Sequence, residues 1–244
     1  MKTSGNTVLI TGGSSGIGLA LAQRFLELNN QVIITGRDAQ KLEAIRQKHP
    51  QMGIFAGDLT LTATQKALVA WLEANYPTLN ILVNNAAVQY NYLFTDETDQ
   101  SQQISYEIAT NLTAPVMLTH LLLPLLRKKP QSAVVNVSSG LFLSPKKSAS
   151  VYCATKAAIH SFSCTLRYQL EAQGMRVFEI VPSLVDTPMT QGRGKNKITS
   201  EALVDEFLDC FQRDRFEIYI GKAKLLKWLH RFIPSVASRL LKNS

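Results

Sequence analysis

The sequence has few cysteines, and the three present, Cys153, Cys164 and Cys210, form no close C-x-x-C pair. An odd number of cysteines without such a pair predicts neither a disulfide framework nor a zinc site. This pattern favours a reducing, intracellular compartment, so we expect a cytoplasmic protein.

Long uninterrupted apolar runs are scarce as well. Residues Met1 to Asn6 are short and polar and lead directly into an apolar strand. We find no later stretch that approaches the roughly 18 uncharged apolar residues of a membrane span. The sequence therefore predicts a protein that is neither secreted nor integral to a membrane.

Acidic residues are absent from position 222 onward, although the whole chain has 18. Six basic residues occupy that segment, namely Lys222, Lys224, Lys227, Arg231, Arg239 and Lys242. They supply most of the formal net charge of +8, and the rest of the chain is nearly neutral, with 20 basic and 18 acidic residues. The positive charge thus belongs to one basic C-terminal segment, 222–244, which argues against a nucleic-acid partner.

Apolar runs rich in valine and isoleucine alternate with stretches of helical period along the whole chain. A length of 244 residues with 45% hydrophobic content suits one compact domain, 1–244. The seven runs lie at 8–10, 32–34, 53–55, 81–83, 134–137, 176–181 and 217–220. This alternation predicts an α/β fold of the Rossmann type, a doubly wound, mainly parallel seven-stranded sheet with helices on both faces.

A glycine-rich turn directly follows the first of these runs, in Thr11-Gly12-Gly13-Ser14-Ser15-Gly16-Ile17-Gly18. We expect Gly12 to permit the tight turn, Gly16 to let the backbone approach a pyrophosphate, and Gly18 to allow close helix–sheet packing. The helix that begins here would favour negative charge at its N-terminus. The turn therefore predicts a dinucleotide site.

Tyr152 and Lys156 stand four residues apart, which places both on one face of a helix. A free tyrosine titrates near about 10, and a neighbouring ammonium favours its phenolate. Lys156 would therefore tune Tyr152 as a general acid and base. A half-buried tyrosine beside a surface lysine is the alternative when the pair is taken alone.

The glycine turn and the Tyr-Lys pair together resemble the short-chain dehydrogenase/reductase family, with its T-G-x-x-x-G-I-G and Y-x-x-x-K motifs. The resemblance runs from about Thr7 to Thr187. It implies reversible hydride transfer between a nicotinamide cofactor and a carbonyl compound or secondary alcohol, with Tyr152 supplying the proton. It also implies that Ser139, thirteen residues before Tyr152, bonds the substrate carbonyl.

The resemblance implies a fourth catalytic residue, Asn111, which would extend a proton relay through Lys156. A helix cap or kink is the other role open to this asparagine. Asp58 would contact the adenine, and two segments depart from the family pattern, with Ala87 and Ser183 each in place of a glycine. The full set of implied cofactor residues is Gly12, Ser14, Ser15, Gly16, Ile17, Gly18, Arg37, Asp58, Leu59, Asn85, Ala86, Ala87, Tyr152, Lys156, Pro182, Val185 and Thr187.

The choice between NADP and NAD depends on the end of the second apolar run, Thr35-Gly36-Arg37. The family's acidic position falls on Gly36, and the guanidinium of Arg37 suits bidentate contact with a 2′-phosphate. Asp38 fits better as the N-cap of a helix from Ala39 to His49. We therefore favour NADP, with a solvated surface charge as the alternative role of Arg37.

The family pattern does not predict the substrate or the subunit and surface contacts, and two segments bear on these. Residues 188–212 combine flexible glycines with Arg193, Lys195 and Lys197, which suggests a mobile lid over a small-molecule substrate. Those cations either meet an anionic substrate or form a solvated loop. The basic segment 222–244 would cover the cleft, pack in a homodimer or homotetramer, or lie weakly on an anionic membrane surface.

A narrower resemblance, in the glycine motif and the tail, is to DltE-like short-chain oxidoreductases. The rival function is a non-catalytic, NADP-sensing regulator or a membrane-surface scaffold on the same fold. Such proteins typically lose the tyrosine or the lysine, and this chain keeps both Tyr152 and Lys156.

Overall fold

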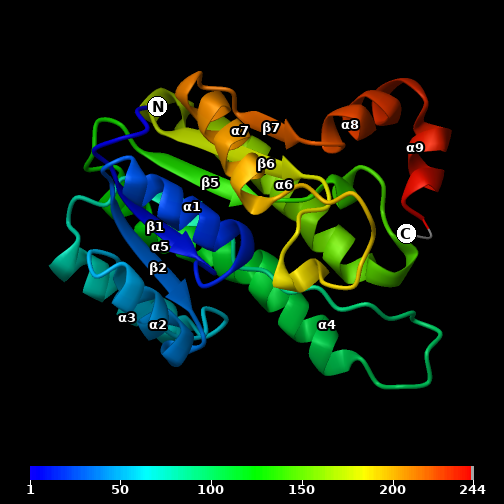
Figure 1. Cartoon of the computed structure of the whole chain (residues 1–244), viewed down its shortest axis with the longest axis horizontal. Coiled ribbons are helices and arrows are strands. Elements are labelled where there is room, and N and C mark those ends of the chain that lie inside the picture. Colours follow the sequence, from blue (N-terminus) through cyan, green and yellow to red (C-terminus); the bar gives the residue numbers. More distant parts are fainter. Residues whose placement is uncertain (243–244) are drawn as a thin grey trace.

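The computed structural model describes residues 1–242, and its centre is a sheet of seven strands that all run parallel (Figure 1). The strand order is β3-β2-β1-β4-β5-β6-β7. The strands are β1 (Thr7–Thr11), β2 (Gln31–Gly36), β3 (Gly53–Ala56), β4 (Ile81–Asn84), β5 (Ala133–Val137), β6 (Arg176–Pro182) and β7 (Glu217–Ile220). All seven runs predicted from the sequence are strands, and the fold class is confirmed.

Helices connect the strands and cover both faces of the sheet. They are α1 (Gly16–Glu27), α2 (Ala39–Lys48), α3 (Thr62–Asn75), α4 (Ser101–Ile108), α5 (Ala114–Leu126), α6 (Ser150–Leu170), α7 (Ser200–Gln212), α8 (Ala223–Phe232) and α9 (Pro234–Leu240). Short turns of other helical types are η1 (Ala109–Thr113), η2 (Gly140–Phe142), η3 (Lys147–Ala149), η4 (Glu171–Gln173) and η5 (Pro188–Thr190). Asp38 caps α2 as predicted, because its side chain accepts a hydrogen bond from the Lys41 backbone N–H.

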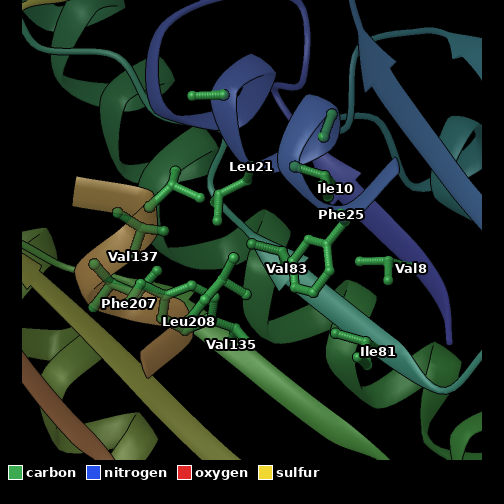
Figure 2. Packing of buried hydrophobic residues seen from close by; sticks show 14 of the residues in the cluster. Val8, Ile10, Leu21, Phe25, Ile81, Val83, Val135, Val137, Phe207 and Leu208 are labelled. Carbon is green, nitrogen blue, oxygen red and sulfur yellow. The ribbon is translucent and has the colours of Figure 1, made fainter. Parts of the chain in front are cut away.

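Alternate residues of each strand face opposite sides of the sheet, so two separate apolar clusters hold the helices. One cluster joins α1, α2 and α7 to the sheet, and the other joins α3, α5 and α6. Figure 2 shows the first cluster, where Leu21 and Phe25 of α1 and Phe207 and Leu208 of α7 lie over strand residues such as Val83 and Val135. This burial stabilises the sheet whose strand ends carry the site described below.

Helix α7 occupies the second half of the predicted lid. Its side chains Leu203, Val204, Phe207 and Phe211 are at most 1% exposed, and it packs along α1. This helix therefore belongs to the core, and only residues 188–199 of the predicted lid lie outside it.

Helices α4 and α5 form one helical run, Ser101–Leu126, through the π-helical turn η1. By length and composition alone, this run is long and apolar enough to cross a membrane. The expectation that no segment reaches this length was wrong, because polar but uncharged residues such as Asn111 obscured the run. Leu118, Leu122 and Leu126 are buried in the second core cluster, so α5 packs one face on the sheet and leaves the other face of the run exposed.

The basic C-terminal segment forms α8 and α9, which lie beyond β7 at one end of the molecule (Figure 1). Ala223, Leu226 and Ala237 are buried, whereas Leu225, Trp228 and Phe232 are more than half exposed. The Ser144 hydroxyl donates a hydrogen bond to the Ala237 carbonyl, and the Lys147 N–H donates to the Lys242 carbonyl at 3.0 Å. The segment is thus tied to the loop that precedes α6.

Candidate functional site

A cleft opens at the carboxyl ends of the parallel strands, where ligands bind in sheets of this type. Most of the predicted cofactor residues line it together, namely Gly12, Ser14, Ser15, Gly16, Ile17, Arg37, Asp58, Leu59, Asn85, Ala86, Ala87, Tyr152, Lys156, Pro182 and Thr187. Gly18 and Val185 lie behind this lining. Val185 is 3% exposed in the core, and a Cβ on Gly18 would lie 2.3 Å from the Gly12 carbonyl oxygen.

The glycine turn has the conformation that the sequence predicts. Gly12 and Gly16 have φ of 64° and 53°, in the left-handed region that favours glycine. A Cβ on Gly12 would lie 2.8 Å from the Ala86 backbone, so this turn packs directly against the segment that follows β4. The Asn85 side chain completes the contact by donating hydrogen bonds to the carbonyls of Thr11 and Gly12 at 2.9 and 3.1 Å.

The turn leads directly into α1, and no acidic residue lies in the first turn of that helix. The first backbone N–H groups of α1 therefore face the cleft with the positive end of the helix dipole. The combination of a glycine turn, a helix N-terminus and a long open cleft fits the pyrophosphate and the two nucleosides of a dinucleotide.

The far end of the cleft holds a chain of polar contacts that the sequence did not reveal. Arg37 Nη1 donates to the Tyr106 hydroxyl at 2.5 Å, and that hydroxyl donates to Asp58 Oδ2 at 3.1 Å. Burial raises the pKa of Asp58, but hydrogen bonds from Thr60 and Tyr106 and the charge of Arg37 lower it below its usual value. Asp58 is thus held as a carboxylate beside a cation at the predicted adenine position.

Tyr106 comes from α4, which no sequence motif connects to Arg37 or Asp58. Its ring lies 5.4 Å from the Arg37 guanidinium carbon. Long-range proximity of this kind follows from the sheet order rather than from local spacing.

Tyr152 and Lys156 meet as predicted, one turn apart on α6, with the Lys156 Nζ 5.5 Å from the centre of the tyrosine ring. Both side chains are buried, at 8% and 3% exposed. Lys156 Nζ donates a hydrogen bond to the Val137 carbonyl at 2.8 Å, which holds it at the end of β5. A surface lysine beside a half-buried tyrosine, the alternative reading of this pair, does not describe these positions.

Burial shifts both groups toward their neutral forms. It raises the pKa of Tyr152, and a hydrogen bond with the Ser139 side chain partly offsets this. Burial lowers the pKa of Lys156 to about 8, against the opposing charges of Glu179 and Glu107. Near neutral pH, the site therefore holds a protonated phenol beside a lysine that still carries most of its charge.

Ser139 follows β5 and caps the turn η2, where its Oγ accepts a hydrogen bond from the Leu141 N–H at 3.2 Å. Because the oxygen accepts this bond, the hydroxyl proton is left to be donated. Contact with Tyr152 brings the three predicted residues of the proton chemistry to one place, at the end of β5 and the start of α6.

Asn111 lies within η1 and is 1% exposed. Its amide accepts from the Val88 N–H and donates to the Val88 carbonyl, both at 2.8 Å, and it donates to the Thr155 hydroxyl at 3.4 Å. In η1 the Asn111 side chain points toward the segment after β4 and toward α6. The side chain therefore joins two walls of the cleft, and the predicted relay role stays a prediction.

Sequence reasoning also missed a buried acid near these groups. Glu107 is fully buried, and its Oε1 accepts a hydrogen bond from the Tyr90 N–H at 3.1 Å. Burial raises its pKa, while that bond and the charge of Lys156 lower it. A glutamate in an otherwise neutral helical stretch was the available signal.

No group of three or more histidine, cysteine or acidic side chains in residues 1–242 is arranged to hold a metal. All three cysteines are free.

Comparisons with known proteins identify a family and a similar relative. The model of the family described as short chain dehydrogenase matches residues 6–198. The uncharacterized oxidoreductase DltE of Bacillus subtilis is 45% identical over 224 residues, which cover 89% of this chain and 89% of the relative. The narrower resemblance seen in the sequence is thereby confirmed.

Three solved structures have the same fold. A short chain dehydrogenase from Burkholderia cenocepacia in complex with NADP has a TM-score of 0.87 at 22% identity, covering 99% of this chain and all of the other. A short-chain dehydrogenase from Sphingobium yanoikuyae in complex with NADPH has a TM-score of 0.80 at 27% identity, covering 94% and 95%. A 3-ketoacyl-(acyl-carrier-protein) reductase from Brucella melitensis complexed with NADH has a TM-score of 0.83 at 21% identity, covering 91% and 100%.

Proposed function

Because the chain belongs to the short-chain dehydrogenase family, we propose that this oxidoreductase interconverts a carbonyl group and a secondary alcohol, with Tyr152 as the general acid and base. The observation that carries the proposal is the meeting of Ser139, Tyr152 and Lys156 beside a cleft with a dinucleotide-type glycine turn. When bound, the nicotinamide cofactor supplies or accepts the hydride.

The chain's own residues handle the proton and the developing charge. The Ser139 hydroxyl donates a hydrogen bond to the substrate oxygen, and the Tyr152 phenol gives its proton to the same oxygen during reduction. The ammonium of Lys156 stabilises the phenolate that remains. Its bond to the Val137 carbonyl keeps it in position for this role.

We propose NADP as the preferred cofactor. Arg37 supports this, since it lines the cleft beyond β2 with a guanidinium suited to a 2′-phosphate. In this structure the guanidinium bonds the Tyr106 hydroxyl and forms no ion pair with an acidic side chain of residues 1–242, although its charge reaches the Asp58 carboxylate. The relative with bound NADPH lends further support, whereas the NADH complex shows that this fold accepts either form.

The proposed assembly and location rest on exposed surfaces. Ile108, Met117 and Tyr168 of α4, α5 and α6 are 39%, 39% and 72% exposed, which supports a homodimer or homotetramer that covers these helices. The exposed apolar side chains of α8 support subunit or weak membrane-surface contact. The free cysteines support a cytoplasmic location.

A panel of carbonyl compounds with NADPH and with NADH tests the proposed reaction, run beside Tyr152→Phe. We expect turnover with NADPH, and we expect the variant to lose about 10²- to 10⁴-fold in kcat because it lacks the proton donor. Tyr168→Phe makes the same change at an exposed position of the same helix, so it is the matched control and should stay near wild type. Turnover that the Tyr152→Phe change leaves intact would refute the mechanism.

A further inference from the structure

The loop between η5 and α7 contains three cations, and the fold uses them differently. Lys197 Nζ pairs with Asp186 Oδ1 at 3.2 Å and donates to the Thr190 carbonyl at 2.7 Å, so its charge anchors the loop. Lys195 is exposed to solvent. Arg193 is only partly exposed, which separates it from a simple solvated charge.

Arg193 is held in an unusual stretch of backbone. Its neighbours Gly192 and Gly194 have φ of 73° and 59°, and its own N–H donates to the Thr190 carbonyl at 3.0 Å. The Nη1 of its guanidinium is buried and has no hydrogen-bond partner among residues 1–242. Burial of an N–H of a charged group costs desolvation free energy, and no hydrogen bond in the described chain offsets that cost. A bound anion would offset it.

A second cation comes from the loop before α6. Lys146 is half-buried, and its backbone N–H donates to Cys153 Sγ at 3.4 Å. Burial lowers the pKa of the Lys146 ammonium, and the nearby charge of Arg193 lowers it further. No acidic side chain of the described chain forms an ion pair with either cation.

Backbone contacts place the two cations next to residues of the reacting end. The Lys146 N–H bonds Cys153, which follows Tyr152, and the Arg193 N–H bonds Thr190, directly after Pro188 and Met189 of the cleft lining. Burial raises the pKa of Tyr152, and the positive charge of Arg193 is among the effects that lower it. Arg37, by contrast, lies beyond β2 with Asp58 and Tyr106. Glu107 also acts on Tyr152, but it is fully buried and bonded to the Tyr90 backbone, so it does not pair with Arg193.

We propose that Arg193, assisted by Lys146, binds an anionic oxygen-bearing group of the substrate. The enzyme then acts on small carbonyl or hydroxy compounds that also carry a carboxylate or a sulfonate. The guanidinium offers two parallel N–H groups to such an anion, and Lys146 adds a point charge. The inference rests on the proposed function, since that function places the substrate carbonyl at Tyr152 and Ser139.

The test uses three ketones that differ only in the group one methylene away from the carbonyl. These are 3-oxobutanoate, 2-oxopropane-1-sulfonate and the neutral 3-oxobutanamide. Each is titrated calorimetrically into the NADP⁺ complex of the full chain, which cannot reduce a ketone, and NADPH oxidation is followed in separate assays. We expect at least one anion to bind tighter than the amide, and the carboxylate and sulfonate arms identify which anion the site prefers.

Arg193→Gln should weaken binding of the preferred anion about 10- to 100-fold and leave binding of the amide unchanged. Lys146→Gln should have a smaller effect of the same kind. Lys195→Gln, a matched loss of charge in the same loop, should behave as wild type.

Equal binding of all three compounds would overturn the inference, and so would the absence of measurable binding of either anion. An Arg193→Gln loss of affinity that the amide shares would overturn it as well. The proposed function fails separately. In that case the anions bind in an Arg193-dependent way, but no compound of the wider panel is turned over in a Tyr152-dependent way.

Discussion

Two side chains at the site, Tyr152 and Lys156, have pKa values shifted by the same cause in opposite directions. Burial penalises the charged form of each, so the tyrosine keeps its proton and the lysine loses its proton more easily. The protonated tyrosine is the state that a proton donor for carbonyl reduction needs. The easier loss of the lysine proton limits the pH range over which Lys156 supports the reaction.

The rate of carbonyl reduction should fall as the pH rises through about 8. Lys156 is cationic below its pKa of about 8 and neutral above it, and the neutral amine no longer stabilises the Tyr152 phenolate. The measurement is kcat/KM for reduction between pH 6 and 10 at saturating NADPH. Lys156→Arg should move the alkaline limb upward where activity survives, and a flat wild-type profile up to pH 10 would contradict the assignment.

The side chain of Arg37 should decide between the two cofactors. Arg37→Glu replaces a cation that suits a 2′-phosphate with an anion that repels it, so we expect Kd for NADPH to rise by about 10-fold or more while NADH binding is kept. Fluorescence titration of both cofactors measures this. Lys48→Glu, at the end of α2, makes the same change of charge away from the cleft. An equal loss for both cofactors would count against the NADP preference.

At the scale of elements, α8 has two unlike apolar faces. Leu226 is 8% exposed and its Cδ2 would lie 3.4 Å from a Cβ on Gly140, next to Ser139. Leu225, one residue earlier, is 59% exposed. One face therefore supports the turn η2, and the other is left to solvent or to a partner.

Leu226→Ala should lower the free energy of unfolding by about 2 kcal/mol or more, because it opens a cavity under η2. It should also lower kcat/KM several-fold with little change in the Kd for NADPH, since the turn carries Ser139 but not the glycine motif. Urea unfolding and steady-state kinetics measure the two effects. Leu225→Ala is the matched control and should change stability by no more than about 0.5 kcal/mol. Identical behaviour of the two variants would show that α8 does not support the site.

For the molecule as a whole, the cleft draws residues from both halves of the sheet, so a bound cofactor should stabilise the entire domain. At a concentration of 100 times its Kd, NADPH should add about 2.7 kcal/mol to the free energy of unfolding. For a domain of this size that corresponds to a rise in Tm of at least about 5 °C. Thermal unfolding with NADPH and with NADH, each at the same concentration, measures it, and a larger shift with NADH would reverse the proposed preference.

Regular periodicity explains what the sequence predicted. The seven strands, the cap at Asp38 and the helical spacing of Tyr152 and Lys156 are local patterns, and each is found in the structure. The motifs at strand ends met in one cleft because parallel strands end at one edge of a sheet.

Contacts between distant segments could not be predicted in this way. The bond of Tyr106 to Asp58, the buried position of Glu107 and the buried Nη1 of Arg193 depend on the tertiary placement of α4 and of the loop at 191–199. The predicted lid was too long for a related reason, since the apolar stripe of α7 serves the core. Composition alone did not separate a core helix from a mobile one.

The tie between the tail and the catalytic loop has a thermodynamic consequence. Ser144 and Lys147 bond the carbonyls of Ala237 and Lys242, and the same loop leads into the helix of Tyr152. A partner that binds the exposed side of the tail therefore acts as an effector of the site, provided that its affinity differs between the free and the substrate-bound loop. By linkage, substrate binding must then change the affinity of the tail for that partner by the same factor. The occupancy of the tail surface and the state of the reacting phenol would then report on one another.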